Sequence, residues 1–235
     1  MGYYYDLHVH SKECSGCAAT SAPDLVVASK KAGYSGFALT NHFLTGNNCV
    51  PKELPWEERV AYYWNAYLDA KRVGDEIDFD VFFGIEHHYG NAREILIYGI
   101  DYDFLASIPD FCSLTPEEIC DRVHEFGGFV SHAHPFRERG YIPQGDFNMD
   151  YSYLDAIEII NSANREIEDV YAKELQEKLD LAYTVGNDLH YTPHLESFPN
   201  SGLVFENRIR TSEELVYALK ARLGVPKITG ERYFK

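Results

Sequence analysis

Short apolar runs rich in β-branched and aromatic residues alternate with longer amphipathic stretches along the whole chain. Runs of this composition predict strands, and the amphipathic stretches predict helices. Strands are expected near residues 3–9, 36–41, 80–86, 94–100, 128–133, 154–160, 182–187 and 202–206. Helices are expected near residues 23–32, 56–75, 116–126, 164–179 and 212–222. Repeated alternation of strand and helix implies a parallel sheet, and seven or eight such strands imply closure into a barrel.

Two of the predicted helices begin with the sequence pattern of a capping box, Thr115-Pro-Glu-Glu118 and Thr211-Ser-Glu-Glu214. In this pattern the hydroxyl and the glutamate each satisfy a backbone N–H group. The chain has 235 residues, and no stretch rich in Pro, Gly or Ser divides it. We therefore expect one α/β domain over residues 1–235.

Composition excludes several classes of function. The chain has 21 Lys and Arg against 37 Asp and Glu, and a net charge of −16 opposes binding to anionic membranes or to nucleic acid beyond a mononucleotide unit. No segment approaches 18 apolar residues, and the N-terminus lacks a signal-peptide pattern, so we expect a cytoplasmic protein. Five cysteines without an export signal indicate free thiols. Nothing in the sequence indicates an oligomeric state.

The histidines are placed where a barrel would gather them. His8 and His10 are two residues apart in a predicted strand and therefore point to the same side. Nine of the ten histidines lie at or just after a predicted strand: His8, His10, His42, His87, His88, His132, His134, His190 and His194. His124 lies in a predicted helix, where we expect a surface or packing role. The C-terminal strand ends of a parallel barrel meet on one face, so the nine side chains are expected to lie near one another.

Carboxylates occur at the same strand ends, namely Asp6, Glu86 and Asp188. Imidazoles mixed with carboxylates suit zinc, manganese or iron. A structural zinc site uses about four ligands, and this set is larger. The sequence therefore predicts a multinuclear catalytic metal site.

Five motifs resemble those of the PHP (polymerase and histidinol phosphatase) superfamily of metal-dependent phosphoesterases. They are DLHVHS (6–11), ALTNH (38–42), GIE (84–86), AHPFR (133–137) and GNDLH (186–190), in the order found in that family. The resemblance implies a distorted (β/α)7 TIM-like barrel with two to three divalent metal ions. It also implies hydrolysis of a small phosphate ester.

The resemblance implies a set of ligands for each ion. The first ion is expected to bind His8, His10, Glu86 and Asp188, with Glu86 bridging to the second. His134 is expected to bind the second ion, and His42 and His190 the third.

The sequence leaves other ligands open. Glu13 is the candidate that completes the third site, with Cys14 or Cys17 behind it. Glu94 is the candidate for the second site. His87, His88 and His132 are alternatives, and at most one of His87 and His88 should face the site because adjacent strand residues point in opposite directions. One departure from the family is Asn41, where Asp is usual.

The expected mechanism is attack by a metal-bridging hydroxide on a phosphate monoester of a small substrate. Arg137 is expected to bind the phosphate oxygens, and its alternative role is a surface ion pair with Glu138. Asp188 or His194 is expected to provide the proton for the leaving alcohol. The alternatives are a metal-dependent amide or ester hydrolase, which typically uses a lysine ligand, and a noncatalytic metal-binding module.

Overall fold

The computed structural model describes residues 2–142, 149–197 and 200–230. The strands are β1 (Tyr3–Val9), β2 (Gly36–Leu39), β3 (Asp80–Gly90), β4 (Arg93–Tyr98), β5 (Phe129–His132), β6 (Ala156–Asn161), β7 (Ala182–Gly186), β8 (Asn200–Phe205) and β9 (Val225–Thr229). The helices are α1 (Ala22–Lys31), α2 (Trp56–Ile77), α3 (Tyr102–Ala106), α4 (Pro116–Phe126), α5 (Glu166–Leu179), α6 (His194–Ser197) and α7 (Ser212–Lys220), with 3-10 turns η1 (Phe111–Ser113) and η2 (Tyr151–Tyr153). All predicted strands and helices are present, whereas α3, α6 and β9 were not predicted.

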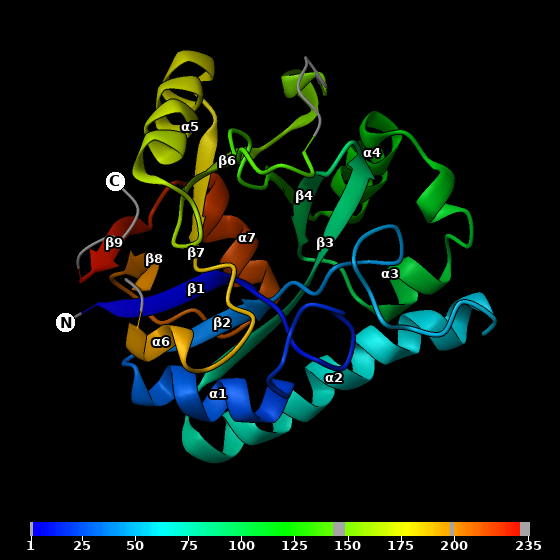
Figure 1. Cartoon of the computed structure of the whole chain (residues 1–235), viewed down its shortest axis with the longest axis horizontal. Coiled ribbons are helices and arrows are strands. Elements are labelled where there is room, and N and C mark those ends of the chain that lie inside the picture. The colour runs from blue at the N-terminus through cyan, green and yellow to red at the C-terminus, as the bar shows by residue number, and fades with distance from the viewer. Residues whose placement is uncertain (1, 143–148, 198–199, 231–235) are drawn as a thin grey trace.

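One sheet runs in the order β7-β6-β5-β4-β3-β2-β1-β8-β9 (Figure 1). The β1–β2, β2–β3, β5–β6 and β6–β7 pairs are parallel, as predicted. The expectation of an all-parallel sheet is wrong elsewhere, because β4 is antiparallel to both of its neighbours and β8 is antiparallel to β1 and β9. Only Asn91 and Ala92 connect β3 to β4, too few residues for a parallel crossover. Both have positive φ (52° and 54°), as tight hairpin turns require.

The sheet nearly closes where the chain leaves β7. His10 N donates to Leu189 O (2.8 Å), and Leu189 N donates to His8 O (3.2 Å). A Cβ at Gly186 would lie 2.4 Å from His8 Cβ, so this close approach requires glycine. The mixed α/β arrangement confirms the predicted distorted TIM-like barrel.

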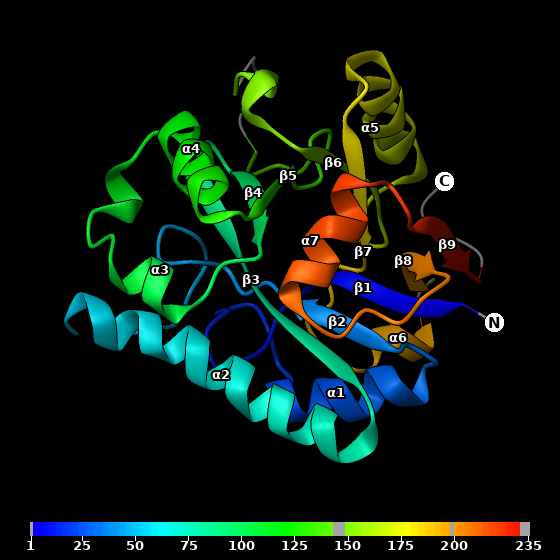
Figure 2. The same cartoon turned by 180° about the vertical axis from the view of Figure 1, so that it is seen from behind.

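Two apolar layers support the barrel. Helices α1 and α2 lie together along one flank of the sheet, and their apolar side chains form a core cluster with Val9, Phe37 and Phe83 (Figure 1). Helix α7 crosses behind the sheet in this view and lies in front of β1 and β2 in Figure 2. Its Leu215 and Val216 belong to a second core cluster on the inner side of the barrel. The strand ends that carry the polar side chains therefore lie on the face opposite α7.

The two predicted capping boxes form to different extents. At α4, Thr115 Oγ1 accepts from Glu118 N (3.2 Å), and Thr115 N donates to Glu118 Oε2 (2.8 Å), so both halves are present. At α7, Thr211 Oγ1 accepts from Glu214 N (3.2 Å). The Glu214 carboxylate instead accepts from Arg210 N (2.7 Å), so that box is half formed. Among the described helices, none combines the length and the apolar character needed to cross a bilayer.

Candidate metal centre and active-site cavity

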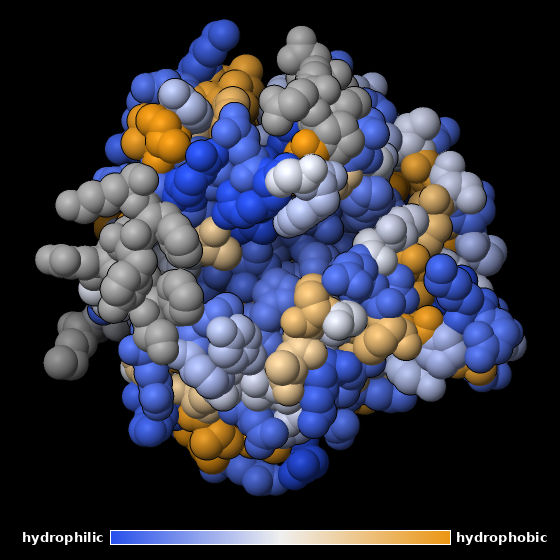
Figure 3. All heavy atoms as spheres, viewed as in Figure 1, coloured by the Kyte–Doolittle hydropathy of each residue, from blue (hydrophilic) through white to orange (hydrophobic). Residues whose placement is uncertain are grey.

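The polar strand ends meet beside a cavity of about 680 Å³, whose lining includes His42, Glu94, His134, Arg137 and Asp188. Figure 3 shows a hydrophilic hollow near the middle of the face seen in Figure 1. These five residues come from the ends of β2, β5 and β7 and from the hairpin of β3 and β4. Residues far apart in the sequence are therefore gathered at one end of the barrel.

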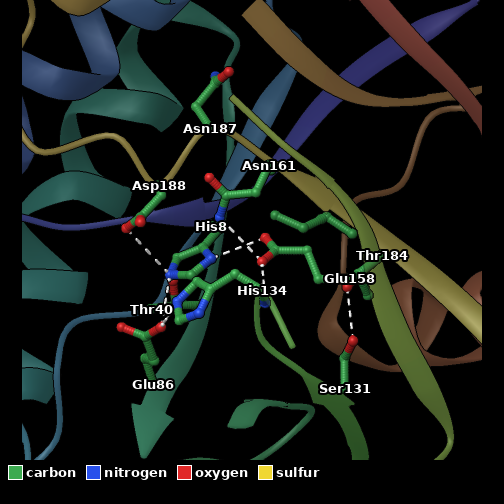
Figure 4. A network of polar contacts seen from close by, with 12 residues as sticks. His8, Thr40, Glu86, Ser131, His134, Glu158, Asn161, Thr184, Asn187 and Asp188 are labelled. Atoms are coloured by element: carbon green, nitrogen blue, oxygen red, sulfur yellow. Dashed lines mark hydrogen bonds and ion pairs between the residues drawn. The ribbon is translucent and has the colours of Figure 1, made fainter. Parts of the chain in front are cut away.

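Glu86, on β3, lies at the centre of the cluster and is fully buried. Its Oε1 is 3.1 Å from His8 Nε2 and 3.0 Å from His134 Nε2, as Figure 4 shows. Its Oε2 is 2.7 Å from His42 Nδ1 and 3.4 Å from His10 Nε2. One carboxylate thus contacts four imidazoles, a position from which it can bridge two ions.

Asp188 joins the cluster from the loop that follows β7. Its Oδ1 lies 3.1 Å from His10 Nε2 and 3.5 Å from His8 Nε2. Its Oδ2 accepts from Arg137 Nη1 (2.6 Å), and Arg137 Nε donates to Asn164 Oδ1 (2.9 Å). Asp188 has φ of 56°, an uncommon conformation for a non-glycine residue. His134 also has positive φ (28°), so two of the gathered side chains leave a strained backbone.

The β3–β4 hairpin adds Glu94 to the cluster. Its Oε1 is 3.3 Å from His42 Nδ1, and its Oε2 is 3.6 Å from His134 Nε2. Glu94 pairs with His88 across the hairpin, so Glu86, His88 and Glu94 share one face. His88 Nε2 accepts from Ala92 N (3.0 Å). His87 points the other way and packs against Phe43 and Phe111, so only His88 of this pair faces the cavity.

The side chains form four overlapping groups whose ligand atoms lie within 4.8 Å of one another. The groups are His8/His10/Asp188, His8/Glu86/His134, His42/Glu86/Glu94 and His10/His42/His190. Five buried atoms of these groups make no hydrogen bond of good geometry to any described residue: His8 Nε2, His10 Nε2, His42 Nδ1, Glu86 Oε2 and Asp188 Oδ1. Buried polar atoms are normally paired. Converging unpaired nitrogen and oxygen atoms fit divalent transition metal ions.

The charges in the cluster also favour cations. Burial opposes ionisation of Glu86, but the neighbouring His8 and His42 hold the pKa of its carboxyl well below the usual range. Burial likewise opposes ionisation of Asp188, and Arg137 and His8 hold its pKa low. Burial, with His42 and His190 nearby, lowers the pKa of His10 well below its usual value. Ionised carboxylates and neutral imidazoles are the forms that bind metals. The carboxylates nearby raise the pKa values of His8 and His42 despite burial, so a metal ion would displace protons from these two rings as it binds.

Glu158, on β6, was not predicted from the sequence, although it holds two members of the cluster. Its Oε1 is 2.9 Å from His8 Nδ1 (Figure 4). Its Oε2 accepts from His134 N (2.9 Å) and from Asn161 Nδ2 (3.0 Å). The one signal for it in the sequence is a single carboxylate inside the apolar run of residues 156–160.

Asp6 supports the cluster from behind and lies in none of the four groups. Its Oδ1 accepts from His8 N (3.1 Å) and Asn187 N (2.9 Å), and its Oδ2 accepts from Asn187 Nδ2 (2.6 Å). Burial raises the pKa of Asp6 to about 7 despite these hydrogen bonds. Asp6 therefore holds together the backbones that carry His8 and Asp188.

Asn41 lies behind the cluster as well. Its Oδ1 accepts from Ser11 N (2.7 Å) and Ser15 Oγ (3.0 Å). Ser15 Oγ in turn accepts from His42 N (3.0 Å) and contacts His10 Nδ1 (3.2 Å). The amide at position 41 thus orders the loop after β1.

Of the candidates predicted to complete the sites, Glu94 alone belongs to the four groups, and Glu13, His132 and Cys14 do not line the cavity. The Glu13 carboxylate instead accepts from Ala22 N (3.1 Å) at the start of α1, because the unpaired N–H groups of a helix start attract an anion. His132 points to the other side of β5, where its Nε2 lies 2.9 Å from Tyr89 OH. Burial lowers the pKa of His132 to about 3. Cys14 is buried within the apolar core.

The other candidates lie at the edge of the cavity. Cys17 Sγ is 3.0 Å from His190 Nε2. Burial would raise the pKa of the Cys17 thiol, but hydrogen bonds with His190 and His42 lower it to about 6. His194, at the start of α6, lines the cavity with its ring against Tyr191. His124 contacts Asp155 Oδ2 (2.8 Å) away from the site, in agreement with the packing role expected of it.

No known family profile matches the sequence, and no curated protein is significantly similar to it. Solved structures do resemble it. A two-domain protein from Bacteroides vulgatus, which contains a predicted PHP-like metal-dependent phosphoesterase, matches with a TM-score of 0.72 and 12% identity over 97% of this chain. The chain has the PHP-like fold. The present chain spans 65% of the length of that protein.

The PHP-like fold also relates this chain to enzymes with other described activities. A lesion-specific endonuclease from Pyrococcus furiosus matches with a TM-score of 0.60 and 18% identity, over 97% of this chain and 58% of its own. An amidohydrolase from Chromobacterium violaceum, solved with bound sulfate and no metal, matches with a TM-score of 0.50 and 14% identity over 79% of this chain and 87% of its own. At identities this low, the structural similarity shows a shared fold alone.

Proposed function

We propose that this protein is a metal-dependent hydrolase that cleaves a small phosphate ester, with a preference for monoesters. Two to three divalent ions (zinc, manganese or iron) would be held by the buried cluster. The residues that would hold them are His8, His10, His42, Glu86, Glu94, His134, Asp188 and His190. Such ions, when bound, lower the pKa of a water molecule toward neutrality and stabilise charge on a phosphoryl group.

One observation favours a phosphate ester as the substrate. Arg137 lines the cavity and is 8% exposed, and its Nη2 makes no hydrogen bond to any described residue. Its other nitrogens are fixed by Asp188 and Asn164, so the guanidinium is held in one orientation. A fixed, buried guanidinium N–H group suits an anionic phosphate oxygen better than a neutral amide. The alternative pairing of Arg137 with Glu138 does not form, because Glu138 contacts Arg165 instead.

Other residues near the cluster orient the metal-binding side chains or could exchange a proton with the substrate. Glu158 orients His8, and Asp6 orients the backbone of both His8 and Asp188. The low pKa of Asp188, which arises from Arg137 and His8 despite burial, suits binding rather than delivery of a proton. His194 lines the cavity and is therefore the candidate that exchanges a proton with the leaving alcohol.

The main alternative is hydrolysis of an amide or carboxylic ester on the same fold. That chemistry typically uses a lysine ligand, and no lysine is among the described residues that line the cavity. A noncatalytic metal-binding module is the second alternative, which the unpaired Arg137 Nη2 does not favour. The acidic charge of −16 favours a small phosphorylated substrate over a long nucleic acid.

The experiment is a screen of protein loaded with manganese, zinc or iron against phosphate monoesters, phosphate diesters, amides and carboxylic esters. We expect release of phosphate from at least one monoester. Hydrolysis of amides or esters alone, with no phosphate released from any monoester or diester, would contradict the proposal. An absence of all activity in protein of full metal content would favour the noncatalytic module.

A further inference from the structure

One of the four groups of candidate metal ligands differs from the other three because it contains no carboxylate. It consists of His10, His42 and His190, whose ligand atoms lie within 4.8 Å of one another. The rings of His10 and His190 are 4.4 Å apart, and those of His10 and His42 are 4.3 Å apart. His10 Nε2 also lies 3.1 Å from Asp188 Oδ1, and His42 Nδ1 lies 2.7 Å from Glu86 Oε2, so both rings are shared with neighbouring groups. A metal at this position therefore needs a further donor from this chain.

The thiol of Cys17 is placed to be that donor. Its Sγ lies 3.0 Å from His190 Nε2, and both residues line the cavity. The loop that carries Cys17 is fixed on both sides. Gly16 N donates to Asn47 O (2.8 Å), and Ala19 N donates to His190 O (2.9 Å). The backbone on both sides of Cys17 is therefore held in place by hydrogen bonds.

The imidazole of His190 is oriented for binding through the nitrogen that faces Cys17. Its Nδ1 lies 2.8 Å from the carbonyl oxygen of Asp188, which can only accept, so Nδ1 carries the hydrogen. The Nε2 lone pair then points toward Sγ. Ligand histidines in metal sites commonly show this arrangement, with one ring nitrogen bonded to a backbone carbonyl.

The distance between Cys17 Sγ and His190 Nε2 is close to the distance between two atoms that bind the same ion. Zn–S and Zn–N bonds of about 2.3 and 2.0 Å at a tetrahedral angle separate sulfur from nitrogen by about 3.5 Å. The atoms are 3.0 Å apart, so they need to separate by about half an ångström. A small side-chain rotation of the exposed Cys17 provides this movement.

We propose that Cys17 is a thiolate ligand, together with His42 and His190, of a metal position that prefers zinc or iron(II) to manganese. As the Sγ–metal bond forms, the S–H bond breaks and the proton passes to solvent. Thiolate and imidazole donors favour these softer ions, whereas the carboxylate-rich groups around Glu86 and Glu94 also suit manganese. This inference rests on the proposed metal site and adds the identity of the metal at one position.

The test is optical absorption of reduced protein loaded with cobalt(II) to full stoichiometry. Wild type should show a sulfur-to-cobalt charge-transfer band in the near ultraviolet. C17S should lose the band and bind zinc at this position at least about tenfold more weakly, with a smaller change for manganese. C49S is the matched control and should keep the band, because the Cys49 thiol faces the backbone oxygens of Lys12 and Glu13.

A second variant guards against a folding defect in C17S. Cys17→Asp supplies an oxygen donor, so it should retain the bound equivalent of cobalt while losing the band. Absence of the band in fully loaded wild type, or its persistence in C17S, would overturn the proposal. The measurement uses no substrate, so its result is independent of whether any phosphate ester is hydrolysed.

Discussion

The imidazole of His8 is held between two buried carboxylates, with Nδ1 2.9 Å from Glu158 Oε1 and Nε2 3.1 Å from Glu86 Oε1. Both carboxylates are fully buried. The backbone N–H of His134 also donates to Glu158, so this one side chain fixes the position of two residues of the cluster. With Nδ1 donating to Glu158, the lone pair of Nε2 is directed into the cluster.

We predict that Glu158→Gln weakens metal binding about 10- to 100-fold, because a neutral amide makes the His8 imidazole less basic and orients it less firmly. Calorimetric titration of metal-free protein with zinc or manganese measures this change. Glu118→Gln is the matched control, since Gln can replace Glu in the capping box at the start of α4. Unchanged affinity in a folded Glu158→Gln variant would show that Glu158 has no role in metal binding.

Replacing Glu86 by Gln should remove metal and activity together. The Glu86 carboxylate contacts four imidazoles, and its negative charge would be needed between two ions bound there. Elemental analysis of dialysed protein should find two to three equivalents of transition metal in wild type and a clear loss in the variant. His124→Gln, on the outer surface of α4, should retain both properties. Less than one equivalent in wild type grown with manganese, iron or zinc would argue against a multinuclear site.

Arg137→Ala should lower turnover as well as apparent affinity for a phosphate ester, because the guanidinium interaction strengthens as charge develops in the transition state. The expected loss is roughly 2.7–4 kcal/mol, or about a hundred- to a thousandfold in rate. Arg137→Lys should recover only part of it, because lysine lacks the bidentate fork. Metal content is measured in parallel, since Arg137 also binds Asp188. Near wild-type turnover in a fully loaded Arg137→Ala variant would leave phosphate binding to the metals.

Acid should destabilise the metal-free protein in part through His132. Burial lowers the folded pKa of His132 to about 3, well below its usual value of 6.5. Between these values the unfolded chain binds a proton that the native state does not, so stability falls as pH falls through this range. From pH 7 to pH 5 the free energy of unfolding should fall by about 2 kcal/mol for one such group. His132→Phe should show a correspondingly shallower loss in urea unfolding, and parallel pH profiles would contradict this prediction.

Much of the site could be predicted because ionisable residues are conspicuous in apolar strands. His8, His10 and Glu86 each lie in or beside an apolar run, and the order of the strands brings them together. The position of Glu94 could also be predicted, because a strand was expected near residues 94–100. The hydrogen-bond partners of individual side chains could not be predicted from the sequence. Glu13 is an example, because its carboxylate binds the start of α1, whose location depends on tertiary packing.

The direction of β4 was the main feature of the fold that strand and helix patterns did not reveal. The sequence Gly90-Asn91 is a turn signal, but the predicted strands near 80–86 and 94–100 leave a gap between them that conceals a two-residue hairpin. β9 escaped detection because Val225 and Ile228 are exposed and Pro226 interrupts the strand pattern. Glu158 was missed because a lone carboxylate in an apolar strand has no periodicity to identify its partner.

The closure between β1 and the residues after β7 joins two segments that are far apart in the sequence. His8 and His10 lie in or beside β1, and Asp188 and His190 lie in the loop that follows β7. An ion bound by His8, His10 and Asp188 would cross-link segments about 180 residues apart, much as a disulfide does, but reversibly. Because such binding occurs only in the folded state, the resistance of the protein to unfolding should rise with the concentration of free metal. A cell that is short of metal would then hold less of the folded protein, as well as less activity per molecule.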